Sequence, residues 1–183
     1  MEWRKIYHFE VSDHIDELIS FLGDKRDENK IALIASFTES KGKMNSTFHP
    51  DNIRIGPSLS SGFDLYRDIN YQIPWLMHPK SDYTPFWIEG KSNDLNMVSF
   101  IYGCQGFESD YIGVILGRDF VRRGGQWKID NIDGLANCVR NNPELALKLL
   151  QNRYRIFLIR GMLGTVIFCE DEETSHYLKN ILT

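Results

Sequence analysis

The chain has 183 residues, of which 42% are hydrophobic, 13% aromatic and 25% charged. This composition is typical of one globular domain and excludes a disordered tail. A chain of this length buries roughly 70% of its unfolded surface, so it needs neither a disulfide nor a metal to fold. A motor with two nucleotide-clamping domains needs more chain, because each such domain takes about 100 to 200 residues.

The charge of the chain is unevenly distributed. The 21 basic and 25 acidic residues give a net charge of −4, which argues against a polybasic membrane-binding or nucleic-acid coat protein. Residues 118–160 nevertheless hold nine basic and four acidic side chains, a local +5 that leaves −9 for the rest. We interpret this stretch either as one anion-facing side of the domain or as ordinary uneven surface charge.

The cysteines and the N-terminal residues indicate the compartment. Cys104, Cys138 and Cys169 form no CxxC pair and are expected to be reduced thiols. The first residues lack the apolar run of a signal peptide, and no segment approaches the roughly 18 apolar residues of a membrane span. We therefore expect a soluble cytoplasmic protein without a membrane partner.

The first elements in chain order predict the start of an α/β unit. Residues 5–11 alternate like a strand, and Ser12 is expected to cap a helix that runs to about Leu22. Residues 31–37 (IALIASF) are typical of a strand buried on both faces of a parallel sheet. Residues 38–95 show no helical period and are rich in turn-forming residues, so we expect a β- and loop-rich insertion.

Regular patterns return in the second half of the chain. Two more buried strands are expected at 97–102 and 111–116, and Gly124-Gly125 predict the turn of a hairpin over 121–129. The remaining expected elements are a helix over 143–158 that begins at Pro143 and is capped by Asn142, a strand over 164–169, and a helix over 172–182 capped by Asp171. Strands separated by helices predict an open, mostly parallel α/β sheet.

The usual nucleotide-binding signature is absent. The P-loop pattern GxxxxGK[ST] fails at Gly42-Lys43, because Met44 follows and no glycine lies five residues before Gly42. Without that backbone cradle the chain has no evident means of holding a triphosphate alone. The run 166–171 (VIFCED) imitates the acidic strand end that holds Mg²⁺ in P-loop enzymes. We interpret it as a strand followed by a helix cap.

A second pattern raises the possibility of a nuclease. Glu89-Gly90-Lys91 follows the apolar residues 86–88, which we expect to form a short edge strand. Metal-dependent nucleases use such a glutamate with an upstream aspartate to hold Mg²⁺, and the lysine lies beside the attacked phosphate. The candidate upstream aspartates are Asp51, Asp64 and Asp68. The alternative is a charged loop after an edge strand.

Two stretches carry more specific patterns. In residues 100–119 (FIYGCQGFESDYIGVILGRD) a strand candidate breaks at Gly103, exposes polar residues and then re-enters the sheet, and ligands of open α/β sheets bind at strand ends. In residues 152–162 (NRYRIFLIRGM) an apolar run separates Arg155 from Arg160. Such arginines contact phosphate or pair with a carboxylate. Five residues apart, they lie about 140° apart around a helix and need not share a partner.

Together the two stretches resemble motifs V and VI of superfamily 1 DNA/RNA helicases, and most closely the Schlafen-group-3-like helicase-domain family of bacterial proteins. The matching residues of the first stretch are Gln105, Gly106, Glu108, Asp110, Tyr111, Gly113, Val114, Ile115, Gly117 and Asp119. Those of the second are Asn152, Tyr154, Arg155, Leu158, Arg160, Gly161 and Gly164. The resemblance extends from about residue 5 to 180.

The resemblance implies a RecA-like second motor domain, with an open, mostly parallel sheet and helices on both faces. Such a domain closes over ATP and Mg²⁺ held mainly by a P-loop-containing first domain, which this chain lacks. It implies that Arg160 is the arginine finger, with Arg155 supporting the same face. It also implies that Glu108 contacts the nucleotide ribose and that Gln105 and Gly106 couple nucleotide state to the bound strand.

Three hypotheses follow. In the first, the chain is the ATP-closing half of a helicase-like motor on single-stranded DNA or RNA and hydrolyses no ATP alone. In the second, it is a free-standing module that binds single-stranded nucleic acid and stacks bases on tryptophan. The candidate nucleic-acid contacts are Arg118, Arg122, Arg123 and Trp75, with Trp87 and Trp127 as further stacking candidates. In the third, Glu89 and Lys91 belong to a Mg²⁺ nuclease. The first two hypotheses assign no metal ligand to this chain.

Overall fold

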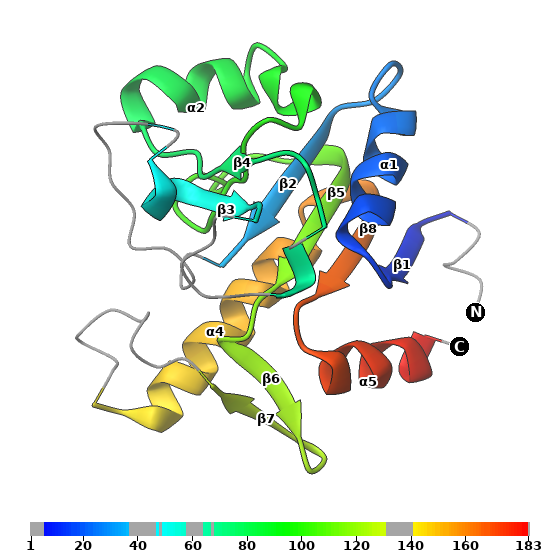
Figure 1. Ribbon diagram of the computed structural model, residues 1–183, viewed down its shortest axis with the longest axis vertical. Helices are drawn as coiled ribbons and strands as arrows, with labels where there is room; N and C mark the ends of the chain where they lie inside the picture. The colour runs from blue at the N-terminus through cyan, green and yellow to red at the C-terminus, as the bar shows by residue number, and fades with distance from the viewer. Residues whose placement is uncertain are drawn as a thin grey trace.

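A parallel sheet forms the centre of the fold, which is known from a computed structural model describing residues 6–36, 47, 49–57, 64–66, 68–130 and 141–182. The strand order is β1-β8-β5-β2 (Figure 1). These strands are β1 (His8–Ser12), β2 (Ile31–Ala35), β5 (Ser109–Leu116) and β8 (Gly161–Cys169). All their pairings are parallel, with Val114 of β5 opposite Ile34 on one side and Ile167 on the other. The expected open parallel α/β sheet is confirmed.

The strands expected at 31–37 and 111–116 are confirmed as β2 and β5. Every residue of β2 is buried, as is β5 from Ile112 onward, because helices or loops cover both faces of the sheet. The last strand begins at Gly161, three residues earlier than the expected 164. The strand expected at 97–102 is reduced to two isolated bridges, Ser99 with Ile34 and Val98 with Trp75. It stops there because the chain turns at Phe100, whose carbonyl accepts from two later amides.

The helices α4 (Pro143–Leu158) and α5 (Glu172–Leu182) have the bounds expected from the sequence. The Asn142 side chain accepts from the backbone N–H of Leu145 at 3.1 Å, and Asp171 accepts from that of Thr174 at 2.9 Å. These are the expected N-caps. No helix in the described part of the chain is long and apolar enough to cross a membrane.

The cap expected for the first helix is wrong. Helix α1 (Ile15–Lys25) begins after His14, and Glu17 accepts from the backbone N–H groups of Asp13 and His14 at 2.8 and 3.2 Å. Ser12 instead ends β1, and its hydroxyl donates to the carbonyl of Ile167 at 3.2 Å. Ser12 lies two residues before the N-cap His14, and Glu17 makes the capping-box contact to the His14 backbone.

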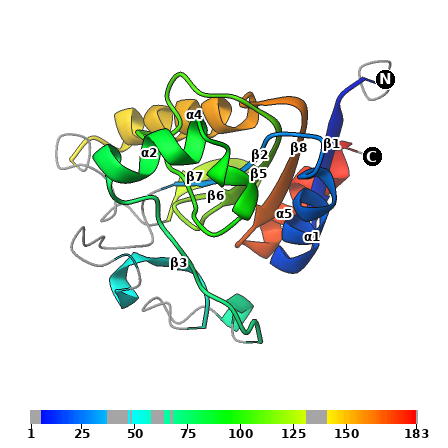
Figure 2. The same cartoon turned by 90° about the horizontal axis from the view of Figure 1, so that it is seen from above.

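Helices cover both faces of the sheet (Figure 2). Apolar residues of α4 and α2 (Pro79–Trp87), such as Phe157 and Trp87, pack in one core cluster, whereas Leu18 and Leu22 of α1 pack in the other. Gly113 of β5 permits the close approach of α1, because a Cβ there would lie 2.6 Å from the Leu18 side chain. This two-layer cover is the arrangement expected for a RecA-like domain.

The segment expected as an insertion contains short antiparallel strands and one helix. Strands β3 (Ile53–Ile55) and β4 (Ile73–Pro74) pair antiparallel, as expected. Helix α2 is a correction. It ends at Trp87 and therefore contains Phe86 and Trp87, where an edge strand over residues 86–88 was expected. Pro79 opens the helix and Asp82 accepts from the backbone N–H of His78 at 3.0 Å. Short 3₁₀ turns occur at Pro50–Asn52, Asp64–Tyr66 and Lys91–Asp94.

A hairpin extends the chain beyond the end of β5. Strands β6 (Phe120–Arg123) and β7 (Gln126–Ile129) pair antiparallel, as expected. Gly124 and Gly125 connect them with φ values of 56° and 79°, the pair of left-handed conformations that a two-residue hairpin turn requires. The hairpin lies at the carboxyl end of β5, next to α5.

Candidate functional site

The two motif stretches meet at the end of the sheet where the parallel strands β5 and β8 begin, which we call the amino edge. The backbone N–H of Ser109, at the start of β5, donates to the carbonyl of Arg160, just before β8, at 3.0 Å. The Arg160 guanidinium donates from Nη1 to the carbonyl of Phe107 at 3.4 Å and from Nε to that of Ile156 at 3.3 Å. The structure therefore brings Arg160 beside the segment that carries Gln105, Gly106 and Glu108.

Arg160 has a half-buried side chain but no carboxylate partner among the described residues. Its two hydrogen bonds to backbone carbonyls are long, so much of its donor capacity is unused. It also influences Cys104: burial raises the pKa of that thiol to about 11, and the nearby Arg160 charge opposes the rise. Cys104 is thus a protonated thiol at neutral pH.

The loop that precedes β5 presents polar groups from a fixed base. The Phe107 ring stacks on Trp87 with centroids 5.3 Å apart and planes 3° apart, and the Trp87 indole donates to the carbonyl of Gly103. Gly106 has a φ of +81°, a conformation that other residues adopt at a cost. Gln105, Gly106 and Glu108 are all exposed, so their functional groups can reach a ligand.

A tight bulge follows Arg160 and accounts for two glycines of the motif. The register moves from Ser109 opposite Gly161 to Tyr111 opposite Gly164, which leaves an extra residue in β8. A Cβ on Gly161 would lie 2.1 Å from the carbonyl oxygen of Gly164, so only glycine fits there. The bulge therefore fixes the backbone from which the Arg160 side chain extends.

Large apolar side chains surround this edge and are exposed to solvent. Two lie in the bulge, one ends α4 and one lies in the loop before β5. They are Met162, Leu163, Ile159 and Tyr102, with exposed fractions of 59%, 42%, 58% and 70%. Exposed apolar side chains that lie together are typical of a surface that another macromolecule covers.

The same motif stretches contact each other a second time at the opposite end of the sheet, where β5 and β8 end, which we call the carboxyl edge. Asp119 is fully buried and accepts from the hydroxyls of Tyr154 and Ser36, both at 2.6 Å. The Tyr154 hydroxyl also accepts from the backbone N–H of Gly117 at 3.0 Å, and Arg153 donates to Ser36 at 2.7 Å. We call Asp119, Tyr154 and Ser36 the carboxyl-edge clasp. The sequence matched Asp119 and Tyr154 to the family pattern without assigning them a role.

A buried ion pair fastens the insertion to the end of β8. Arg54 and Glu170 both have side chains with no exposed surface, and Nη1 of Arg54 lies 2.6 Å from Oε1 of Glu170. The Tyr66 hydroxyl donates to the same oxygen at 2.5 Å. Glu170 thus serves a structural contact, and sequence reasoning missed it because its partner lies 116 residues away.

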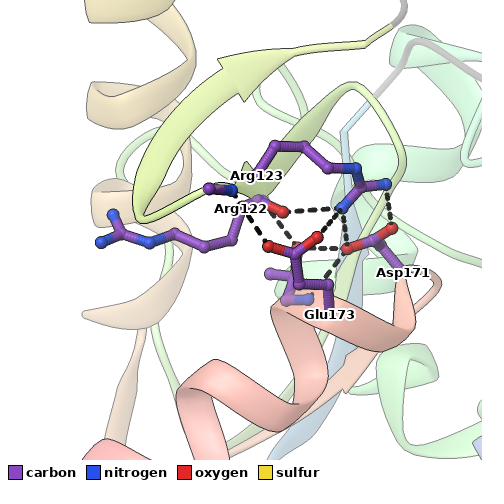
Figure 3. Close-up of polar contacts among 6 residues, drawn as sticks. Arg122, Arg123, Asp171 and Glu173 are labelled. Carbon is purple, nitrogen blue, oxygen red and sulfur yellow. Dashed lines mark hydrogen bonds and ion pairs between the residues drawn. The ribbon is translucent and has the colours of Figure 1, made fainter.

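Two of the expected nucleic-acid arginines make contacts within the domain (Figure 3). Arg123 donates to both oxygens of Asp171, at 2.8 and 2.5 Å, and lies 3.6 Å from Glu173. The Arg122 side chain points away from these carboxylates, and its guanidinium lies 4.3 Å from the centroid of the Tyr177 ring. These contacts dock the hairpin onto the start of α5, and the Arg123 guanidinium is engaged by carboxylates of the domain itself.

The stacking role expected for Trp75 is wrong. The Trp75 and Trp87 side chains are fully buried, so neither offers a ring face to a base. Trp127 is half-buried, with one face stacked on Phe120 at 4.4 Å. Burial of Trp75 comes from packing of the insertion on the sheet, a tertiary effect that composition does not reveal.

The basic stretch 118–160 does not form one face. Arg118 follows β5 at the carboxyl edge, whereas Arg160 lies where β5 begins, and the eight residues of that strand span about 25 Å. Arg118 lines a cleft of ≈ 790 Å³ together with His14, Glu170 and His176. Arg155 also departs from Arg160: it is exposed and borders an apolar groove beside α4.

The geometry assumed for a nuclease is absent. Glu89 follows helix α2 instead of a strand, and Lys91 begins a 3₁₀ turn. Within the described ranges, no three His, Cys, Asp or Glu side chains gather in a way that could hold a metal ion.

Comparison with known proteins agrees with the fold and the motifs. The chain matches the family described as Schlafen group 3, DNA/RNA helicase domain, over residues 1–171. It is 25% identical over 138 residues to an uncharacterized protein of Saccharomyces cerevisiae, YPL245W, an alignment that covers 64% of this chain and 28% of the yeast protein. The chain thus spans less than a third of that relative, and no solved structure matches it. Because the family match extends over nearly the whole chain, the protein belongs to the Schlafen group 3 DNA/RNA helicase domain family.

Proposed function

We propose that this chain is the second motor domain of a helicase-like ATPase and supplies Arg160 as an arginine finger to ATP held with Mg²⁺ by a P-loop domain. The observation that carries the proposal is the half-buried Arg160 guanidinium, which has no carboxylate partner in the described chain. Arg54 and Arg123, in contrast, are paired with carboxylates. An arginine kept without an internal anion is suited to an external one.

The residues of the amino edge have distinct roles in this proposal. ATP supplies the phosphoryl group, and its γ-phosphate gains negative charge as the bond to the leaving group breaks. Arg160 donates hydrogen bonds to that charge, while the carbonyls of Phe107 and Ile156 hold the guanidinium in position. The exposed Glu108 accepts hydrogen bonds from ribose hydroxyls. The exposed Gln105 and Gly106 precede it in the same loop and transmit a movement of the nucleotide to the bound strand.

The exposed apolar side chains around Arg160 support a protein partner at this edge. A free nucleotide would cover only part of the surface formed by Ile159, Met162, Leu163 and Tyr102. A P-loop domain that closes over the edge would bury these side chains and exclude water from the phosphate, which strengthens the contact with Arg160.

ATP turnover tests the proposal. The purified chain alone should show no turnover above background. When it is joined to a P-loop half from a longer member of the family, Arg160→Ala should lower kcat by about 10³-fold or more, the range for arginine fingers. Arg160→Lys should restore little, because a lysine lacks the forked donor geometry. Lys148→Ala, which removes an exposed cation of α4, is the control and should leave kcat unchanged. Turnover by the chain alone that Arg160→Ala abolishes would refute the need for a partner.

We further propose single-stranded DNA or RNA as the polymer on which this motor acts, on the strength of the family's description. Arg118, which is half-exposed at the carboxyl edge, remains the basic candidate from the sequence. Binding of a fluorescent oligonucleotide should weaken as salt rises, because phosphate contacts release counterions. Arg118→Ala should weaken binding about equally for all sequences. Affinity that is independent of salt would contradict a phosphate-binding surface.

A further inference from the structure

A groove of ≈ 400 Å³ runs beside the last two turns of α4 and is almost entirely apolar. Leu116 of β5 and Ile167 of β8 line it from the sheet, Leu158 lines it from α4, and Leu178 lines it from α5. Trp127 of the hairpin is also part of the lining and is held by stacking on Phe120 with planes 5° apart. The groove is thus lined by the sheet, the hairpin, α4 and α5.

Arg155 is the single charged residue among the described side chains that line the groove. It is exposed and makes no hydrogen bond or ion pair within the described chain. Its chemistry is complementary to a carboxylate carried next to an apolar group, because a guanidinium binds carboxylates through paired hydrogen bonds.

The occupant must carry a carboxylate beside an apolar group of side-chain size. Adjacent residues of a peptide present such a pair, with one side chain for the groove and the next for Arg155. Ile159 lines the groove and is 58% exposed, whereas the neighbouring Met162 and Leu163 do not line it and are left to the P-loop domain of the proposed function.

We propose that this groove binds a segment of a partner protein in which an aromatic or branched aliphatic side chain adjoins an aspartate or glutamate. The apolar side chain enters between Leu158 and Leu178, and the carboxylate pairs with Arg155. Arg155 then serves the partner, and Arg160 serves the edge described above. This assignment is independent of the proposed ATPase role, because it stands or falls on Arg155 and leaves Arg160 untouched.

Dipeptide probes test the proposal on the intact chain. N-acetyl-Phe-Asp-amide, its uncharged isostere N-acetyl-Phe-Asn-amide and N-acetyl-Phe-Lys-amide are titrated, and two-dimensional NMR follows the Trp127 indole N–H and the methyls of Leu158 and Leu178. The aspartate probe should bind about twofold to fivefold tighter than the asparagine probe, the range for a partly exposed ion pair. The lysine probe should bind weakest.

Variants locate the contact. Arg155→Gln changes an exposed side chain and should remove the preference for aspartate while retaining binding of the apolar ring. Lys148→Gln should retain the preference. Leu178→Trp, which fills the groove, should abolish binding of all three probes. Equal affinity for the aspartate and asparagine probes, or a preference that survives Arg155→Gln, would overturn the proposal.

Other occupants give distinguishable results. Groove resonances that shift with protein concentration alone would show that a second copy covers the surface. Tighter binding of dodecanoate than of any peptide would identify a small amphipathic anion. No shift with any probe would show that the groove does not bind this chemistry. Each of these results would refute a peptide partner, whatever the outcome of the ATPase measurement.

Discussion

Removal of one hydroxyl tests whether the carboxyl-edge clasp holds the two motif stretches together. Tyr154→Phe deletes the hydrogen bond to Asp119 at 2.6 Å and the one accepted from Gly117 at 3.0 Å, at a fully buried site. A buried bond to a carboxylate contributes about 1.5–3 kcal/mol and a neutral one about 0.5–1.5 kcal/mol. The free energy of unfolding should therefore fall by about 2–4 kcal/mol.

Urea unfolding followed by far-ultraviolet circular dichroism measures this loss. Tyr83→Phe is the matched control, because the Tyr83 hydroxyl makes no hydrogen bond in the described chain, and it should change stability by less than about 0.5 kcal/mol. Ser36→Ala removes the second bond to Asp119. Because the two hydroxyls share that carboxylate, the loss of stability in the double variant should differ from the sum of the two single losses by about 0.5 kcal/mol or more. A folded Tyr154→Phe protein within about 0.5 kcal/mol of the parent would refute the reasoning.

Three further predictions concern other contacts. Glu170→Gln removes the carboxylate charge that faces the buried Arg54 guanidinium and should lower the free energy of unfolding by about 1.5–3 kcal/mol in urea titrations, whereas an unchanged value would contradict a buried pair. Burial alone would raise the pKa of Asp171, but hydrogen bonds from Arg123 and from the first turn of α5 outweigh it and lower the pKa from 3.8 to about 2. Stability from this carboxylate is therefore present above pH 3.8 and is lost as the pH falls toward 2, and Asp171→Asn should remove that part of the acid transition. Gly161→Ala should lower the thermal midpoint, since its Cβ would meet a carbonyl oxygen at 2.1 Å, and an unchanged midpoint would show that the bulge can open.

The elements predicted best are those whose signals lie within a few residues. Helices α4 and α5 begin and end where the sequence indicates, because Asn142, Pro143 and Asp171 act on the backbone next to them. The hairpin was predicted equally well, because two adjacent glycines supply the left-handed conformations of its turn. Helix α2 was missed because apolar residues gather only in its last turn, where Phe86 and Trp87 are buried.

The site was predictable only in part, because its geometry depends on contacts distant in sequence. Motif residues near Arg160 could be assigned to one edge once the two stretches were recognised together. The clasp at Asp119 and the ion pair of Glu170 depend on partners in other elements, at separations of 35 and 116 residues. The burial of Trp75 has the same origin, so an aromatic residue in a loop-rich segment was mistaken for an exposed one.

Tyr154 connects the two surfaces assigned to α4, because it lines the groove beside Arg155 and also bonds to Asp119. A peptide in the groove would therefore contact the residue that fastens α4, the helix that ends two residues before Arg160. Such contact changes the behaviour of Arg160 only if α4 has two arrangements and the peptide prefers one of them. If the clasp allows a single arrangement, peptide and nucleotide bind independently. Tyr154→Phe separates these cases: a peptide effect on ATP turnover that appears or grows when the clasp is loosened would show that the clasp holds α4 in one arrangement in the parent protein.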